Sequence, residues 1–182
     1  MCIRDSLKAI GALGGGQLVE VSRADLVGRY VGHTAPLVNQ VISTALGGVL
    51  FIDEAYSLYR SEQDSFGLEA IDTLVKGMED HRDELVVVLA GYTKEMQEFL
   101  TANSGLASRF PNFIEFPDYT ADELLRITRL QAKGKGYRME DACDAPLLAY
   151  YARRQAEDAA TAGNGRLARN KLEQAILNQS RR

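Results

Sequence analysis

The chain has 182 residues, of which 46% are apolar and 25% are charged, and its formal net charge at pH 7 is −4. This balance is typical of a globular protein with one domain, or one domain and a small second lobe. The mild acidity counts against a protein that binds nucleic acid mainly through phosphate charge, because such proteins carry a basic patch.

The cysteines and the apolar runs restrict the environment of the protein. Cys2 and Cys143 lie far apart without the spacing of metal ligands, which predicts free thiols in a reducing compartment. No apolar run approaches the about 20 residues of a membrane-spanning helix, and the first residues lack the pattern of a signal peptide. We therefore expect a cytoplasmic protein that contacts no membrane.

The first six residues of the chain do not match the residues after them. Residues 1–6 fit no element, whereas Leu7, Ile10 and Leu13 have the spacing of a helix that ends at the glycines of positions 14–16. Because a domain seldom begins midway along a helix, we expect the natural protein to extend further upstream. A short helix that begins at this point is the alternative.

Apolar strands then alternate with amphipathic helices up to residue 117. Unbroken apolar strands separated by helices are typical of a parallel sheet that is covered on both faces. A polar, glycine-bearing loop with one possible helical turn is expected over 22–34. The expected strands are Leu18–Val21, Val49–Ile52, Leu85–Ala90 and Phe113–Phe116, and the expected helices are Pro36–Ala45 and Phe66–Asp80.

The pattern changes at Pro117-Asp118. From Thr120 onward only helical spacing is present, in three segments separated by glycines near positions 134–136 and 163–165. The sequence thus predicts an α/β lobe over residues 1–117 and a small all-helical lobe over residues 118–182.

One strand ends in two adjacent acids. The run Val49–Ile52 is followed directly by Asp53 and Glu54. In α/β sheets, ligands bind at the carboxyl ends of the strands. A Walker B strand needs an acid there to hold Mg²⁺ beside the nucleotide phosphates, and a second carboxylate can orient or deprotonate the attacking water. A buried strand that happens to end in two acids is the alternative.

Longer segments carry a more specific signal. They closely resemble the CbxX/CfqX family of AAA+ proteins, in the right order and over about residues 7 to 179. The segments are Leu26–Ala35, Gly47–Tyr56, Glu69–Asp80, Val88–Tyr92, Gly105–Pro111, Ile114–Tyr119 and Asn164–Asn170. The resemblance implies a P-loop NTPase-type (AAA+) α/β lobe followed by a helical lid lobe.

The resemblance assigns roles around a nucleotide. It makes Asp53 the acid on the Mg²⁺ side, with the ion held through water, and Glu54 the catalytic carboxylate. Tyr92 or Thr93 would be the polar group of sensor 1, unless they form a plain turn at the end of the strand. Arg109 would be the arginine finger that reaches a neighbouring subunit's γ-phosphate, with a surface salt bridge as the alternative.

Two further roles follow from the resemblance. Arg166 would be the sensor-2 arginine of the lid, and Arg169 one turn on would assist it or be a solvated helix charge. Tyr30, Val31 and Gly32 would form pore loop 1, in which an aromatic residue grips a peptide by apolar contact. A core tyrosine is the alternative for Tyr30. His33 and His81 have no ligand partners nearby in the sequence.

One motif of the family is missing from these residues. No segment has the pattern G-x-x-x-x-G-K-[ST] of the phosphate-binding loop, and no lysine follows the glycines at 14–16. We expect these 182 residues alone to lack the first strand and the P-loop, and to bind ATP weakly.

The resemblance leads to a function. It implies a hexameric ring that uses ATP and Mg²⁺ to remodel a protein substrate. The acidic balance and the lack of a long apolar run separately predict no nucleic-acid partner and no membrane. A non-hydrolysing ring scaffold is the alternative, although it would not require Asp53, Glu54, Arg109 and Arg166 together. A loader that handles nucleic acid is disfavoured by the acidic balance.

Overall fold

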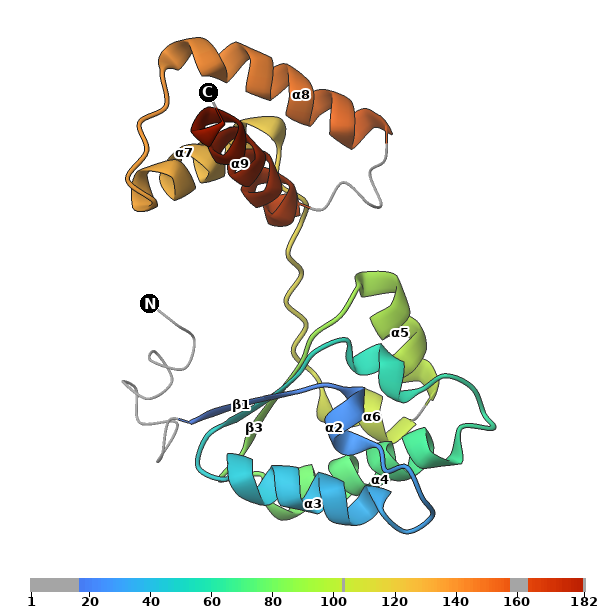
Figure 1. Cartoon of the computed structure of the whole chain (residues 1–182). Helices are drawn as coiled ribbons and strands as arrows, with labels where there is room; N and C mark the ends of the chain where they lie inside the picture. The colour runs from blue at the N-terminus through green and yellow to red at the C-terminus, as the bar shows by residue number, and fades with distance from the viewer. Residues whose placement is uncertain (1–16, 103, 158–163, 182) are drawn as a thin grey trace. The chain divides into compact units, whose positions relative to one another are not determined.

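The chain forms two compact units, one ending at Ile114 and one beginning at Glu115 (Figure 1). The computed structural model describes residues 17–102, 104–157 and 164–181. The helix end expected at positions 7–13 and Cys2 therefore lie outside the described residues. None of the described helices has both the length and the apolar character that crossing a membrane requires.

A three-stranded parallel sheet forms the centre of the first unit. Its strands are β1 (Leu18–Val21), β2 (Val49–Ile52) and β3 (Val86–Leu89), in the order β1-β2-β3. Val21 pairs with Ile52, and Ile52 pairs with Leu89, so the carboxyl ends of all three strands lie level. The predicted parallel α/β sheet is confirmed, and its polar strand-end residues emerge along one edge.

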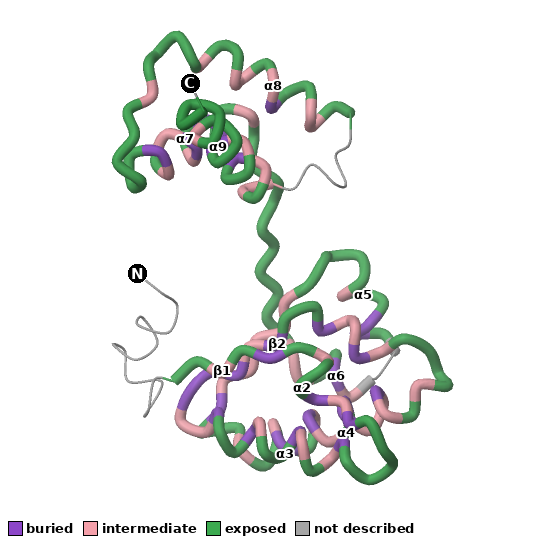
Figure 2. The backbone as a smooth tube through the Cα atoms, in the orientation of Figure 1, coloured by how far each residue is buried: buried purple, intermediate pink, exposed green. Residues whose placement is uncertain are grey.

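Two long helices pack against this sheet. They are α3 (Thr34–Ala45) and α4 (Ser65–Asp80), which run side by side below the strands in Figure 1. Their inward faces are apolar and buried, as the purple stretches of Figure 2 show. A Cβ at Gly77 of α4 would lie 2.3 Å from the Cδ1 atom of Ile42, so the two helices approach closely at that position.

Several short elements were not predicted. The loop after β1 does contain the expected turn, α2 (Arg23–Leu26), but the 3₁₀ turn η1 (Ala55–Leu58) was missed. Two helices that follow β3 were also missed, α5 (Thr93–Ala102) and α6 (Ser104–Arg109). Their signal was a small set of apolar residues that the structure buries, namely Phe99, Leu100 and Leu106.

The strand expected over Phe113–Phe116 is wrong. The segment forms no strand, and Phe113, Ile114 and Phe116 are 68%, 78% and 83% exposed. A strand exists only when a neighbour supplies its hydrogen bonds, and within the described residues no strand pairs with this segment. Its apolar composition alone was therefore misleading.

The second unit is helical, as predicted. It consists of α7 (Ala121–Gly134), the 3₁₀ turn η2 (Asp141–Cys143), α8 (Asp144–Glu157) and α9 (Asn164–Ser180). Thr120 and Glu123 form a capping box at the start of α7. The three long helices meet around a small core of Leu124, Tyr151 and Ala168.

A buried hydroxyl pair joins α7 to α8. The Oγ1 atom of Thr128 lies 2.7 Å from the hydroxyl oxygen of Tyr151 and also donates to the carbonyl of Leu124. Both side chains are buried, and burial is the main reason that the pKa of Tyr151 is raised. Tyr151 therefore stays a neutral partner for Thr128 at neutral pH.

We expect Thr128→Val to destabilise the helical unit more than Tyr151→Phe. The valine leaves a buried tyrosine hydroxyl without a partner, which costs about 1–3 kcal/mol, whereas the phenylalanine removes one bond and its donor together, at about 0.5–1.5 kcal/mol. Urea unfolding followed by circular dichroism measures both, with exposed Tyr137→Phe as the matched control. Equal losses from the two variants would contradict this account of the pair.

Candidate functional site

An acidic turn follows the central strand. Asp53 and Glu54 come directly after Ile52, and both side chains are exposed. Glu54 has φ 48° and ψ 46°, in the left-handed region, while its amide donates to Oδ1 of Asp53 at 3.0 Å. A left-handed conformation costs a non-glycine residue on the order of 1 kcal/mol and persists only where the surroundings impose it. The turn is therefore held in a strained geometry.

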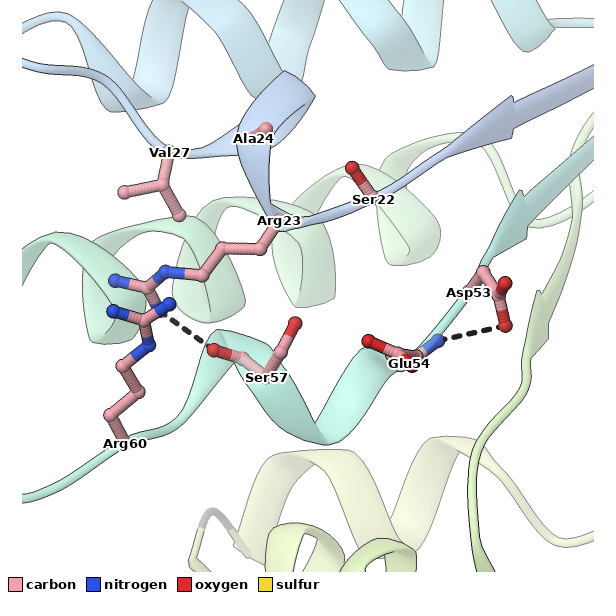
Figure 3. A pocket seen from close by; sticks show the side chains of 8 residues that line it. All are labelled: Ser22, Arg23, Ala24, Val27, Asp53, Glu54, Ser57 and Arg60. Atoms are coloured by element: carbon pink, nitrogen blue, oxygen red, sulfur yellow. Dashed lines mark hydrogen bonds between the residues drawn. The ribbon is translucent and has the colours of Figure 1, made fainter.

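The turn opens onto a pocket of about 440 Å³ (Figure 3). Asp53 and Glu54 lie at one end of the view, and the guanidinium groups of Arg23 and Arg60 lie at the other. The lining residues are Ser22, Arg23, Ala24, Val27, Asp53, Glu54, Ser57 and Arg60. The pocket is thus acidic at the end that adjoins the carboxyl edge of the sheet.

The acids suit a hard divalent metal ion such as Mg²⁺. Among the described residues, no group of three or more histidine, cysteine, aspartate or glutamate side chains is placed to hold an ion by itself. Asp53 and Glu54 together offer two exposed carboxylates. Mg²⁺ keeps several waters and takes one or two protein carboxylates together with substrate phosphates. The turn therefore suits Mg²⁺ that arrives with a nucleotide.

Tyr92 and Thr93 lie beyond the end of β3. Both side chains are exposed, and Thr93 is the first residue of α5. The Tyr92 ring lies 6.3 Å from the ring of Tyr56, which follows Glu54 by two residues. Desolvation and then the charge of Glu54 raise the pKa of Tyr56. Tyr92 thus contacts the segment that carries the acids.

Arg109 is the last residue of α6 and is paired within its own unit. Its Nη2 atom lies 2.5 Å from Oε2 of Glu79, and its Nη1 atom donates to the carbonyl of Gly105 at 3.2 Å. Arg109 does not line the pocket of the acidic turn. A surface salt bridge, the alternative named for Arg109, is therefore what this structure contains, although its partner Glu79, 30 positions away in the sequence, was not predicted.

A clasp closes the loop between α2 and α3. The amide of Gly28 donates to the Oγ1 atom of Thr34 at 3.1 Å, and Thr34 is fully buried. A Cβ at Gly28 would lie 2.7 Å from the Cβ atom of His33, so only glycine fits at this crossing. The two ends of the loop are therefore held together.

The clasp leaves the tip of the loop in solvent. Tyr30 is 67% exposed and Val31 is 89% exposed, and Gly32 has φ +80°, which favours glycine. The Tyr30 ring stands edge-on to the ring of His33, with 5.5 Å between centroids. Tyr30 does not occupy the core, and it is available to a partner.

Arg166 lies in the first turn of α9 and is exposed, as is Arg169. The preceding Asn164 is left-handed, with φ 45°. Its side-chain amide donates to Oδ1 of Asp118 at 2.6 Å, and its Oδ1 accepts from the amide of Tyr119 at 2.9 Å. Asn164 thereby fixes the start of α9. An asparagine before a glycine is the sequence signal for this conformation.

Sequence reasoning also missed Arg23 at the opposite side of the pocket. Its Nη1 atom donates to the carbonyls of Ser57 and Leu58 at 2.8 and 3.0 Å, and its Nη2 atom donates to Oδ1 of Asp64 at 3.1 Å. No local pattern signals these contacts, because the partners lie 34 to 41 positions away. They join the end of β1 to the segment after the acidic turn.

Comparisons with known proteins show the family of the chain. Residues 6–118 match the ATPase family associated with various cellular activities (AAA), and residues 120–182 match the AAA lid domain. Relatives of similar sequence include three that represent different settings. They are a chloroplastic ribulose bisphosphate carboxylase/oxygenase activase of Cyanidioschyzon merolae (45% identical), protein CbxX of a Cupriavidus necator plasmid (46%) and stage V sporulation protein K of Bacillus subtilis (44%).

These matches cover most of this chain but only part of the relatives. The match to the activase includes 98% of this chain and 60% of the activase. The matches to CbxX and to stage V sporulation protein K include 97% and 95% of this chain, and 55% and 54% of those two relatives. The chain thus spans little more than half the length of the curated relatives it matches. With an acidic turn at the carboxyl edge of a parallel sheet and a helical unit after it, the chain belongs to the AAA family of ATPases and is related to the CbxX/CfxQ proteins.

Proposed function

We propose that the protein hydrolyses ATP as part of a homo-oligomeric ring, a hexamer, and uses the energy to remodel a protein substrate. The observation that carries this proposal is the acidic turn. Two carboxylates stand at the carboxyl end of the central strand, and Glu54 is held there in a left-handed conformation. Strained backbone is concentrated at functional sites, where it holds a reacting group in place, and this supports a catalytic role for Glu54.

The two acids would divide the work. Asp53, whose Oδ1 already accepts the Glu54 amide, would hold Mg²⁺ through water. The bound ion would neutralise charge on the phosphates. Glu54 makes no hydrogen bond through its carboxylate within the described residues, so it is free to orient and deprotonate a water molecule. Tyr92 or Thr93 would supply the polar contact on the β3 side.

The position of Arg109 supports a role between subunits. In its pair with Glu79, the glutamate is exposed and Arg109 is half-buried, and ion pairs at the surface contribute only about 0–1 kcal/mol. A phosphate carries more charge than a carboxylate and accepts a bidentate arginine, so it would readily replace Glu79 as the partner. Arg109 is also not among the residues that line the acidic pocket of its own unit. We therefore assign it to a neighbour's nucleotide.

The remaining groups support work on a polypeptide. Tyr30 and Val31, displayed by the Gly28–Thr34 clasp, would contact the chain that passes through the ring. Arg166, on the helical unit, would sense the γ-phosphate, with Arg169 one turn on beside it. The relatives' names point to Rubisco activation in one case and to sporulation in another. The proposal is accordingly confined to a class of substrate, a protein.

Glu54→Gln is expected to keep ATP binding and to lower kcat by about 10²–10⁴-fold, because the amide retains the shape and loses the base. The measurement is steady-state ATP turnover by a form of the protein that carries these residues together with a P-loop, called the P-loop form below. Exposed Glu98→Gln on α5 is the matched control. Near-normal turnover by Glu54→Gln would favour the non-hydrolysing scaffold.

Asp53→Asn is expected instead to raise the Mg²⁺ concentration that the P-loop form requires for half-maximal ATP turnover.

Tyr30→Ala is expected to lower the amount of protein substrate remodelled per ATP hydrolysed by the P-loop form. The aromatic ring is exposed, so its loss removes a grip on the substrate and not a part of the core. Tyr30→Phe should retain most of the work, and Tyr137→Ala, at another exposed tyrosine, should retain all of it. A Tyr30→Ala protein with an early melting transition would contradict the assigned role.

A further inference from the structure

We propose that Arg23 is a positioning residue. It holds the backbone of Glu54 through the η1 turn, and so fixes the direction in which the Glu54 side chain leaves the backbone. The inference rests on the proposed catalytic role of Glu54. Arg23 itself contacts neither Asp53 nor Glu54 through any hydrogen bond or ion pair found in the described residues. Its effect is exerted on the backbone that comes after them.

One nitrogen of the guanidinium, Nη1, holds the η1 turn by hydrogen bonds. This turn begins at Ala55, directly after Glu54. The Nη1 atom of Arg23 donates to the carbonyls of Ser57 and Leu58, and Figure 3 shows the contact with Ser57. The amide of Ser57 in turn donates to the carbonyl of Glu54 at 2.8 Å. A short chain of hydrogen bonds therefore connects Arg23 to the backbone of Glu54.

The other contacts of Arg23 anchor it to α4. Asp64 accepts from Nη2 through Oδ1, and its Oδ2 lies 2.8 Å from Nη1, where the two are paired by charge. Asp64 is also the N-cap of α4 and accepts the amide of Gly67 at 3.1 Å. The Arg23 and Asp64 side chains are only 17% and 12% exposed. The pair is thus largely shielded from solvent.

The surroundings leave this arrangement little freedom. A Cβ at Gly67 would lie 2.0 Å from the carbonyl oxygen of Leu58 and 2.7 Å from Oδ2 of Asp64, so the start of α4 touches both η1 and the ion pair. Hydrogen bonding from Arg23 is the main reason that the pKa of Asp64 is lowered. Asp64 therefore stays charged at neutral pH and retains its hold on Arg23.

Two attachments then act on Glu54 from opposite sides. On the β3 side, the amide of Ala55 donates to the carbonyl of Ala90 at 3.0 Å. On the α2 side, Arg23 draws the carbonyls of η1 toward the end of β1. A strained residue persists only when its surroundings over-determine it. Arg23 supplies the side-chain hydrogen bonds of that restraint on the α2 side, while Ala55 and Leu58 are buried in the core.

The arrangement requires arginine. Its planar group presents five N–H donors in a fixed fork, and here it serves two carbonyls and a carboxylate at once. A lysine ammonium is a compact point charge that cannot reproduce this geometry. Arg60 lines the same pocket but is exposed, and no hydrogen bond or ion pair joins it to η1 within the described residues. It is therefore the matched control.

The first test uses this chain without nucleotide and measures amide hydrogen exchange. Arg23→Lys should speed exchange at the Ala55 and Ser57 amides by about tenfold or more, because hydrogen bonds to a charged group are lost. The β2 amides should keep their protection, and Arg60→Lys should change neither. Asp64→Asn, a second variant, should produce the same local pattern with a smaller amplitude.

Two results of that test would overturn the proposal. Unchanged exchange at Ala55 and Ser57 would show that Arg23 does not restrain the turn. Uniform loss of protection across the sheet in both Arg23→Lys and Asp64→Asn would show a general role in stability and not a local one.

The second test separates this proposal from the function on which it rests. In the P-loop form, Arg23→Lys should lower kcat by about tenfold or more and leave KM for ATP nearly unchanged, because a misplaced catalytic group slows chemistry more than binding. If Glu54→Gln lowers turnover but Arg23→Lys does not, the inference about Arg23 fails alone. If Glu54→Gln itself has no effect, the proposed function fails, while the exchange result still decides whether Arg23 holds the turn.

Discussion

The pairing of β2 with a parallel strand on each side is the constraint on which the rest of the structure depends. Its backbone groups are used by β1 and β3, and its side chains are largely enclosed by the core. Because all three strands end level, the first polar residues after them must emerge along one edge. Asp53 and Glu54 are exposed for this reason.

The segment after β1 connects the proposed ATP hydrolysis with the proposed grip on a protein substrate. Arg23, the first residue of α2, holds η1 beyond the acidic turn. Five positions later, Gly28 begins the clasp that displays Tyr30. Leu26 lies between them and is almost fully buried, so the short helix is anchored to the core. The residues that would contact a substrate and the residue that would orient the catalytic acid therefore lie on one short segment that is anchored to the core by Leu26.

The sequence predicted the parts of this architecture that depend on local pattern. The runs of β1 and β2 are apolar and short, and the acids follow β2 directly, so both the sheet and the exposure of Asp53 and Glu54 could be foreseen. The strand expected at Phe113–Phe116 failed because pairing needs a neighbour, which composition does not report. The Arg23–Asp64 contact could not be foreseen either. It joins residues 41 positions apart and depends on how α4 begins.

The central claim is that each hydrolytic site is divided between two copies of the chain, with the acidic turn from one and Arg109 from the next. Mixing Glu54→Gln subunits with Arg109→Ala subunits of the P-loop form tests it most directly, by measured ATP turnover. Some interfaces then combine an unsubstituted Glu54 from one subunit with an unsubstituted Arg109 from the next. The ATP turnover of the mixture should therefore exceed that of either parent, each of which is expected to be slowed by about 10²-fold or more. Subunits that demonstrably exchange and yet stay as inactive as the parents would contradict the claim.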